Sequence, residues 1–561
     1  MTHRTIHLPS VVSAFVLATL VSSSAGAQAP PQAPPPSPPQ QEPAPPPAPA
    51  PSSAPEMTPV SPAQNPPPAE TPPPSPPAAT ATAAPPAQTP PPAPAPAAPA
   101  APPASAAPAT TPAPAPAGKP PPRPNGKGKR GFASVSEFAR SPYTVKIGDP
   151  ESEWKISIYG FIEFDIMHDS TRSYNDSAGS TVIQREDVLA GQKGRTTFTA
   201  RNSRLGFRME SPEFHGIRPS AVLEGDFMGN QPPNISESQL FNNPTFRVRH
   251  AYVRLLNDYV DVLGGESYVL FGAQPYFFPA SVQYLPVPNQ VLHRSMQLRL
   301  SHTFKTDPIT VDIGAAAVRP IQRDSTLPEG QAALRIIANN WKGLHTPGSL
   351  GTTADGAALS VSGLVRSFRV NEFSANPTTT KTETGWGVSI DALLPVIPVP
   401  DADKRGNALT LNGSFVVGGS IADQMGMTAG VTQPPLPNPP GGTYTSDVDN
   451  GLVVYDRGGT LHTVDWRSFV VGMQYYLPPS GRVFISSNFT QGESRNVTGL
   501  VTDPAQMRSV YRLQRYFDAN IFLDITPAAR IALSYQWTWQ RFLDGASAEN
   551  QRYMFGMYYL F

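Results

Sequence analysis

The last eleven residues of the chain, Gln551–Phe561, alternate in character and carry no polar tail. Successive side chains of a β-strand point to opposite faces. One face of this stretch would carry Tyr553, Phe555, Met557, Tyr559 and Phe561. A strand this aromatic would be an adhesive edge in an open sheet, whereas a closed barrel has no edges. The stretch therefore favours a barrel in which the last strand pairs with the first, over the alternative of a buried strand in a soluble sandwich.

Composition divides the 561-residue chain into two unlike parts. Most of its 71 prolines precede residue 125, so averages over the whole chain mislead. The 42 basic residues equal the 42 acidic residues, whereas a nucleic-acid partner would call for a basic excess. The chain has no cysteine, which excludes disulfides, thiolate metal sites and a lipid-anchoring cysteine. We expect no nucleic-acid partner, no cofactor and no metal site.

The first 27 residues have the pattern of a secretory signal peptide. Arg4 supplies a positive start, Val11–Val21 an apolar run, and Ala25–Ala27 a small-residue cleavage site. The apolar run is too short to span a bilayer as a helix, and no later stretch provides about 20 continuous apolar residues. An exported chain of this kind can still cross a membrane as a β-barrel.

Residues 28–130 form a Pro/Ala-rich tract with few large apolar side chains, so we expect a disordered periplasmic linker. Proline stiffens such chains towards an extended helix of about 3.1 Å per residue. Two roles stay open: an inert tether, or a spacer that contacts peptidoglycan beside the basic residues Lys127, Lys129 and Arg130. Residues 131–152 would be a short lead-in to the folded part.

From residue 153 to residue 561 the sequence alternates with period two in segments longer than ordinary globular strands. This pattern predicts an all-β transmembrane antiparallel barrel of about sixteen strands, an even number as in bacterial single-chain barrels. The predicted strands are 154–168, 195–210, 218–229, 244–256, 259–272, 291–305, 308–319, 331–341, 357–370, 383–397, 408–421, 466–477, 482–491, 513–525, 530–542 and 551–561. Short and long connections alternate, as periplasmic turns and external loops do. The connections 342–356 and 398–407 are the exceptions, since both are long for periplasmic turns.

Several of these segments resemble known families. The aromatic C-terminus, with Tyr559 two residues before Phe561, resembles the C-terminal signature of bacterial outer-membrane proteins. The strand Ala200–Glu210 resembles general porins. Together with Glu224–Phe227, Arg247–Val253 and Leu263–Gly272, it resembles the DcaP-like outer-membrane porins over residues 154–561. The resemblance implies a homotrimer in the bacterial outer membrane, whose third external loop folds inward and which admits small, often anionic, solutes. The family's helical N-terminal arm has no counterpart in the Pro/Ala tract.

The connection 273–290 is the third long one in this count. It is aromatic, rich in proline and without charge, so it needs shelter from water. We expect it to fold into the barrel as a constriction loop, with a contact between protomers as the alternative. The candidate constriction residues are Gln274, Tyr276, Phe277, Phe278, Tyr284 and Asn289.

Charges that alternate with an apolar face should point into the lumen. The candidate pore-lining cations are Arg204, Arg208, Arg247, Arg249 and Arg299, although the parity of the strand with Arg247 and Arg249 is ambiguous. The candidate anions are Glu163, Asp165, Glu224 and Asp226. A basic row facing an acidic row across a narrow gap would orient dipolar or anionic solutes. The alternative is that these charges pair along the wall and keep it rigid.

Taken together, the sequence favours a porin for small hydrophilic, preferentially anionic solutes such as carboxylates. The second hypothesis is a structural or adhesive barrel that tethers the outer membrane to the cell wall through the Pro/Ala tract. A rim hydrolase is a third, but no histidine lies in an H-E-x-x-H or G-x-S-x-G context. We therefore expect no enzymatic activity.

Overall fold

A computed structural model of the chain describes residues 132, 143–149, 152–174, 182–229, 245–282, 287–322, 325, 327–348, 351–425, 439–442, 444, 451–501 and 504–561. The strands are β1 (Tyr143–Ile147), β2 (Trp154–Asp169), β3 (Arg195–Thr199), β4 (Arg204–Glu210), β5 (Arg218–Asp226), β6 (Arg247–Leu256), β7 (Asp261–Tyr268), β8 (Arg294–Lys305), β9 (Ile309–Val318), β10 (Glu329–His345), β11 (Thr353–Asn371), β12 (Thr380–Ile397), β13 (Ala408–Gly419), β14 (Val453–Tyr455), β15 (Leu461–Thr463), β16 (Asp465–Tyr476), β17 (Val483–Ser494), β18 (Tyr511–Asp524), β19 (Ala529–Phe542) and β20 (Ser547–Leu560).

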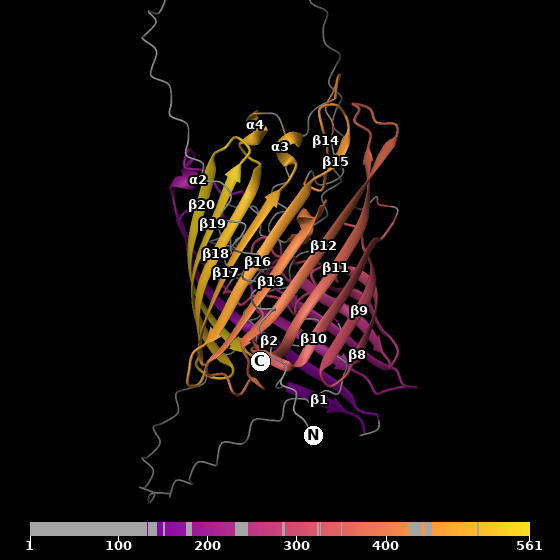
Figure 1. The fold of residues 1–561 in the computed structure, drawn as a ribbon, viewed down its shortest axis with the longest axis vertical. Coiled ribbons are helices and arrows are strands. Elements are labelled where there is room, and N and C mark those ends of the chain that lie inside the picture. Colours follow the sequence, from indigo (N-terminus) through magenta and orange to yellow (C-terminus); the bar gives the residue numbers. More distant parts are fainter. Residues whose placement is uncertain are drawn as a thin grey trace, which may run out of the picture. The chain divides into compact units, whose positions relative to one another are not determined.

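The strands close into one antiparallel barrel (Figure 1). From β4 to β20, each barrel strand pairs with the next one along the chain, and β20 returns to pair with β2. β3 and β4 pair with successive parts of β2 and together form one barrel strand, interrupted at 200–203. Counting them once and leaving out β1, the described residues form sixteen barrel strands. This confirms the predicted fold class, and each predicted strand has a counterpart, with 195–210 split in two.

β1 lies on the seam where the barrel closes. It pairs with the first residues of β2, from Tyr143 opposite Ile158 to Ile147 opposite Trp154. β20 pairs with the next part of the same β2 edge, from Leu560 opposite Phe161 onward. β1 therefore continues the line of β20 beyond its end, within the region expected to be a short lead-in.

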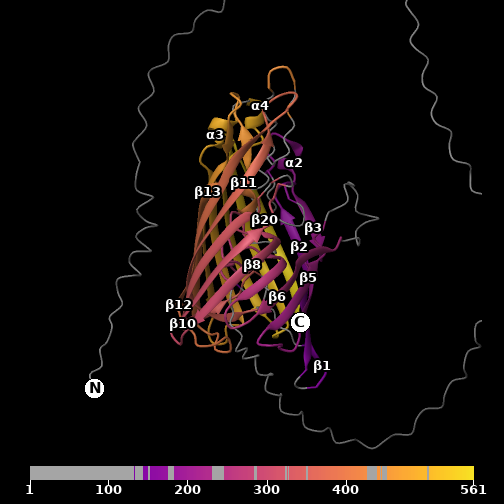
Figure 2. The ribbon, with the colours of Figure 1, turned by 90° about the vertical axis from the view of Figure 1, so that its right-hand side faces the viewer.

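The two ends of the barrel differ, as Figures 1 and 2 show. At one end, which we call the turn end, lie the C-terminus, β1 and short connections such as 306–308 and 525–528. At the other, the loop end, lie the longer connections with the short helices α2 (Leu189–Gln192), α3 (Val497–Leu500) and α4 (Pro504–Met507), the hairpin β14–β15 and the 3-10 helix η3 (Ala422–Met425). None of the helices in the described residues is long and apolar enough to cross a membrane.

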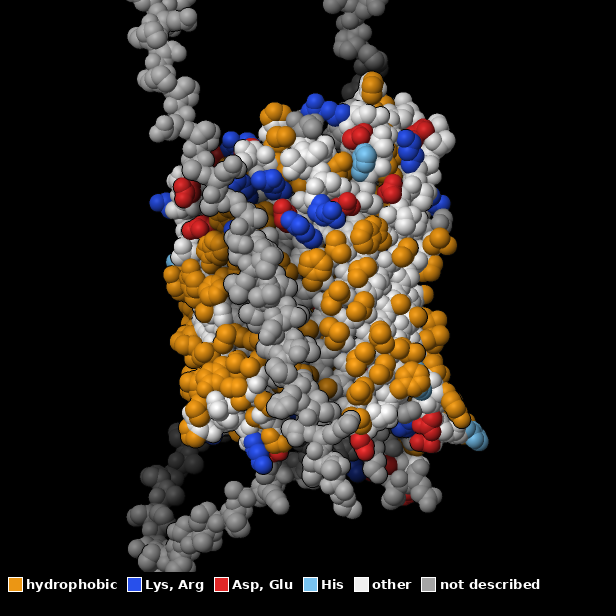
Figure 3. Space-filling model, in the orientation of Figure 1, with side chains coloured by type: hydrophobic (Ala, Val, Ile, Leu, Met, Phe, Trp, Pro, Cys, Tyr) orange, Lys and Arg blue, Asp and Glu red, His pale blue; other side chains and the backbone are white. Residues whose placement is uncertain are grey.

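The outside of the barrel carries a broad apolar band between two polar rims (Figure 3). On β19, Leu533 is exposed, whereas its neighbours Ala532 and Ser534 are buried inside. Ile521 and Tyr553 lie on the same outward face of β18 and β20. Apolar side chains outside and small or polar ones inside are the pattern of a barrel in lipid. The period-two prediction for these strands is confirmed.

The two long connections at the turn end fold into the barrel mouth. Leu344 at the end of β10 is buried there in an apolar cluster with Val399 and Ala402 of the β12–β13 connection and with the stacked rings of Phe484 and Phe522. The residues near Leu344 and the connection 398–407 thus pack against the inner surface of the barrel and fill its mouth. Apolar side chains therefore line part of the lumen at this end.

Candidate functional site

The described residues of the connection between β7 and β8, 269–282 and 287–293, lie inside the barrel. Leu270, Phe271 and Phe277 on this segment are buried, although the segment joins two strands at the loop end. The Tyr276 hydroxyl donates to the carbonyl of Gly356 at 2.7 Å, on the wall strand β11. Inside the barrel these aromatic side chains are sheltered from water.

The tip of this loop is tied to the wall on the far side of the lumen. The Asn488 amide and the Ser486 hydroxyl, both on β17, donate to the carbonyl of Ala280 at 2.7 and 2.9 Å. The Ser281 hydroxyl donates to the Asp518 carboxylate on β18 at 2.8 Å. Asp518 also accepts from Asn488 at 2.7 Å, so wall and loop share one hydrogen-bond network. A loop held by several such bonds keeps a fixed position.

The returning part of the loop is fixed by Asn289. Its amide donates to Thr490 on β17 at 3.0 Å, and its carbonyl accepts from Ser468 on β16 at 2.5 Å. Asn289 has a positive φ of 67°, a conformation that asparagine tolerates better than most residues. Gln274 bonds across the base of the loop to the carbonyl of Val291.

The remaining candidate loop residues face other walls. The Tyr276 ring lies 4.7 Å from the Arg335 guanidinium on β10, and the Phe278 ring lies 5.5 Å from the Tyr268 ring on β7. Phe277 is buried in the core beside Leu270. Tyr284 lies outside the described residues. The loop therefore reaches both the β7–β10 side and the β16–β18 side of the lumen.

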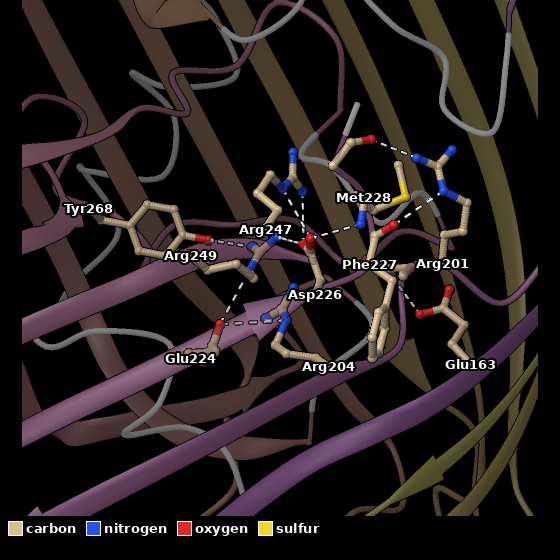
Figure 4. A network of polar contacts seen from close by, with 12 residues as sticks. Glu163, Arg201, Arg204, Glu224, Asp226, Phe227, Met228, Arg247, Arg249 and Tyr268 are labelled. Atoms are coloured by element: carbon tan, nitrogen blue, oxygen red, sulfur yellow. Dashed lines mark hydrogen bonds and ion pairs between the residues drawn. The ribbon is translucent and has the colours of Figure 1, made fainter. Parts of the chain in front are cut away.

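Five of the predicted pore-lining charges form one network on the wall β4–β6 (Figure 4). The Arg249 guanidinium lies 3.2 Å from Glu224 and 2.6 Å from Asp226. Arg247 binds Asp226 at 2.7 Å, and Arg204 lies 3.5 Å from Glu224. Both carboxylates are fully buried and lie on β5, between the arginines of β4 and β6. Positive and negative side chains therefore alternate on one wall. The predicted arrangement, with a basic row facing an acidic row across the lumen, is wrong for these five residues.

A β-bulge explains why the parity of β6 is ambiguous in sequence. Glu224 pairs with His250, and the next residue, Gly225, pairs with Val248, so Arg249 is the extra residue. As a result, Arg249 and His250 are consecutive and both buried, while Val248 is exposed. Bulges redirect side chains in this way.

The other four candidate charges have further contacts of their own. Glu163 accepts from the amide of Asn202, and Asp165 lies two residues along β2 on the same inward face. The Arg208 guanidinium lies 5.7 Å from the Tyr159 ring. Arg299 donates to the carbonyl of Phe132 at 3.0 Å. All four lie on the inner side of the wall, because the apolar side chains beside them in sequence point outward.

Phe132 is a lumen residue that sequence reasoning missed. Its side chain is 3% exposed, its ring lies 5.0 Å from the Arg335 guanidinium, and it packs beside Leu270. A Cβ on Gly314 of β9 would lie 3.1 Å from this ring, so the glycine leaves it room. Arg335, also missed, is ion-paired with Asp312 at 2.8 Å. No signal in the sequence distinguishes Phe132 from other residues of the lead-in.

The 3-10 helix η3 is joined both to the wall and to the loop near the loop end of the lumen. Asp423 on η3 binds Arg366 of β11 at 2.7 Å, and the next residue, Gln424, accepts through its carbonyl from the amide of Leu292 at 2.7 Å. Burial alone would raise the pKa of Asp423, but the Arg366 guanidinium holds that pKa below its ordinary value. The carboxylate stays charged, so the ion pair that holds η3 to β11 persists at neutral pH.

Comparison with solved structures identifies the architecture. The outer-membrane channel DcaP of Acinetobacter baumannii matches with a TM-score of 0.51 and 16% identity, over 73% of this chain and 97% of that one. The chain has the fold of an outer-membrane channel. Looser matches are an anion-selective porin from Comamonas acidovorans (8% identity, 73% and 100% of the chains, TM-score 0.42) and the trimer form of OmpT of Vibrio cholerae (11%, 73% and 99%, 0.40). No protein-family model and no curated protein sequence matches.

Within this fold the inner wall is unevenly covered. The inward side chains Gln514, Asn520 and Gln536 on β18 and β19 are at most 2% exposed, because loops pack over that side. On the wall β4–β6, the side chain of Arg247 remains 33% exposed. That wall presents the guanidinium groups of Arg204, Arg208, Arg247 and Arg249 against two carboxylates. Counted over the inward side chains of these three strands alone the charge is positive, and the adjoining strand β2 adds the buried carboxylates Glu163 and Asp165.

Proposed function

We propose that this chain is an outer-membrane porin for passive diffusion of small hydrophilic solutes, preferentially anions such as carboxylates. The observation that carries the proposal is the uneven lumen: loop 273–290 is bonded to β16–β18, while Arg247 on the opposite wall stays partly exposed. A solute passing the loop would move along the wall β4–β6. The turn end would face the periplasm and the loop end the outside, as in other barrels of this kind.

Charge would come from the arginines and size selection from the loop. Arginine forks bind carboxylates through two parallel hydrogen bonds. Among the described residues, Arg249 is engaged with both Glu224 and Asp226, whereas Arg247 binds Asp226 alone and keeps exposed surface. Arg247 is thus the cation best placed to meet a passing anion, and Arg249 and Asp226 hold it in position. Tyr276, bonded to β11, and Phe278, packed against Tyr268 of β7, would narrow the path.

Uptake into proteoliposomes tests this proposal. We expect the full chain to admit small mono- and dicarboxylates faster than neutral sugars of similar size, and sugars faster than organic cations. Arg247→Ser would reduce the carboxylate rate and leave the sugar rate unchanged. Equal rates for all three solute classes would refute the anion preference. The absence of uptake of any solute would refute the proposal that the chain is a porin.

The alternative of a structural barrel is favoured by a specific observation. Phe132 and the cluster around Leu344 fill parts of the lumen, as a closed barrel would require. The proposed signal peptide (1–27) and linker (28–130), with its peptidoglycan contact, lie outside the described residues. A homotrimer is likewise a proposal, which rests on family resemblance. Deleting 28–130 distinguishes the two functions: a porin keeps its conductance, whereas a tether loses attachment of the membrane to the cell wall.

A further inference from the structure

The outward side chains of β16–β20 change in layers from the turn end to the loop end. Near the turn end one row of the paired strands carries Val483, Leu523, Ile531 and Met557. Three outward rows higher, an aromatic row carries Phe489, Phe517 and Trp537. Trp and Tyr residues typically mark the boundary between hydrocarbon and headgroups. The hydrocarbon boundary therefore lies close to the level of Trp537.

Directly above this level the rows become basic. Arg515 of β18 occupies the next row, where its guanidinium lies 5.4 Å from the Trp539 ring and donates to Gln491 at 2.9 Å. The last row holds Arg467 on β16 and Arg541 on β19. Arg512, the extra residue of a bulge in β18, is exposed beside them. These four arginines are called the basic rim below, and Figure 3 shows Lys and Arg gathered above the apolar band on this face.

Among the described residues, three of the four arginines of the basic rim have no ion-pair partner. Arg467 binds Glu493 at 2.8 Å. Within the described part of the chain, Arg512 and Arg541 make no ion pair or hydrogen bond through their side chains. Four guanidinium groups therefore share this surface with two outward carboxylates, Glu493 and Glu549, and Glu549 accepts from the Trp537 indole at 3.0 Å.

We propose that the basic rim binds the phosphate groups of a phosphorylated glycolipid in the outer leaflet of the membrane. The geometry favours a lipid, because the arginines point outward and lie immediately above the apolar band. A phosphate at that depth would belong to a headgroup whose acyl chains cover the band below. Guanidinium groups bind phosphate through paired hydrogen bonds. The N–H donors of Arg512 and Arg541 are not used by the described part of the protein. The proposal does not depend on conduction, so it stands or falls separately from the porin function.

The test uses the full chain, refolded in detergent micelles that contain a few mole per cent of bis-phosphorylated lipid A. The same lipid with both phosphates removed provides the comparison. Bound lipid is counted by native mass spectrometry over a range of lipid concentrations. The variant R512S/R541S removes the two unpaired arginines, both exposed. The control K404S/R482S removes two exposed cations from the turn end of the same side of the barrel. Heat-modifiable mobility on gels establishes that every variant has folded.

We expect the phosphorylated lipid to bind more tightly than the dephosphorylated one, and R512S/R541S to weaken its binding about 30-fold, from about fivefold per arginine near an anionic surface. K404S/R482S should bind as the original chain does. Equal binding of the two lipids would overturn the proposal, as would an equal loss in the control. Unchanged lipid binding together with a smaller oligomer in R512S/R541S would also overturn it, and would assign the rim to contact between copies of the chain.

Discussion

Gly160 and Phe561 exchange two backbone hydrogen bonds of 2.8 and 3.0 Å, which join the last residue of the chain to the first strand of the barrel. Two residues further along the same edge of β2, Ile158 pairs with Tyr143 of β1. The end of the barrel and the segment that precedes it therefore meet on one strand. This seam is where the aromatic C-terminal strand finds the partner that removes its free edge.

Gly160→Ala should impair closure of the barrel. A Cβ at this position would lie 2.1 Å from the carbonyl oxygen of Arg204, a backbone atom that cannot move aside. A clash of this kind costs on the order of 3 kcal/mol or more. We expect a lower yield of the heat-modifiable folded form on gels. Gly264→Ala on β7 is the control, since a Cβ there meets nothing within 4 Å, and it should fold normally.

Releasing the loop tip should increase fluctuations of the current. The double variant S486A/N488A removes both donors to the carbonyl of Ala280, at a cost of about 1 kcal/mol for each hydrogen bond. Single-channel recordings should show more open-channel noise and more frequent brief closures. Gln536→Ala changes an inward residue of β19 that bonds only within the wall, so its current should be as quiet as that of the original chain.

Phe132→Ala should raise the conductance. The substitution removes a ring that is packed against Leu270 and Arg335 inside the lumen. The channel should widen at this level, and we expect a conductance increase of tens of per cent in planar bilayers. Tyr143→Ala removes an aromatic side chain that is exposed on β1, outside the lumen, and should leave the conductance unchanged. An unchanged conductance in Phe132→Ala would mean that the solute path does not pass this ring.

The features of the structure that can be predicted from the sequence are mainly those with a periodic pattern. Alternating segments such as 530–542 predict both the strand and its outward face, because lipid outside and polar groups inside impose period two. The charge-free aromatic loop 273–290 is predictable for a similar reason, since its side chains need shelter. Its residue Ala280 is tied to the far wall by Ser486 and Asn488, but no local pattern indicates which wall receives it.

Three features escape the sequence because they depend on tertiary contacts. The bulge at Arg249 shifts the parity of β6 by one residue, and alternation cannot show where a strand gains a residue. The pairing of Glu224 and Asp226 with arginines on both sides follows from strand order and register. Phe132 is a single aromatic residue in a Gly- and Lys-rich stretch, so its place in the lumen has no periodic signature.

Acid should loosen one loop at the loop end. Asp544, in the turn between β19 and β20, binds Arg185 in the connection between β2 and β3, and its hydrogen bond from Arg185 lowers the pKa of this carboxyl. A depressed folded pKa means that the ion pair stabilises the loop above pH ~4 and that this stabilisation is lost as the pH falls further.

Asp544→Asn should reproduce the acid state at neutral pH. Amide hydrogen exchange over residues 183–192 should become faster in the variant at pH 7, by severalfold at most, because a partly exposed pair contributes no more than about 1 kcal/mol. The same residues of the original chain should show the increase only below pH ~4, after correction for intrinsic exchange rates. Loosening already at pH 6 would mean that a different group controls the loop.

The reversal potential of the full chain in a planar bilayer, under a tenfold KCl gradient, tests most directly the claim that solutes pass along the arginine wall of β4–β6. A net positive wall predicts a potential of the sign set by chloride, and Arg247→Glu should move it towards the potassium value while Arg482→Ser in the turn end leaves it in place. A potential of the potassium sign in the original chain, or the absence of conductance steps, would contradict the account.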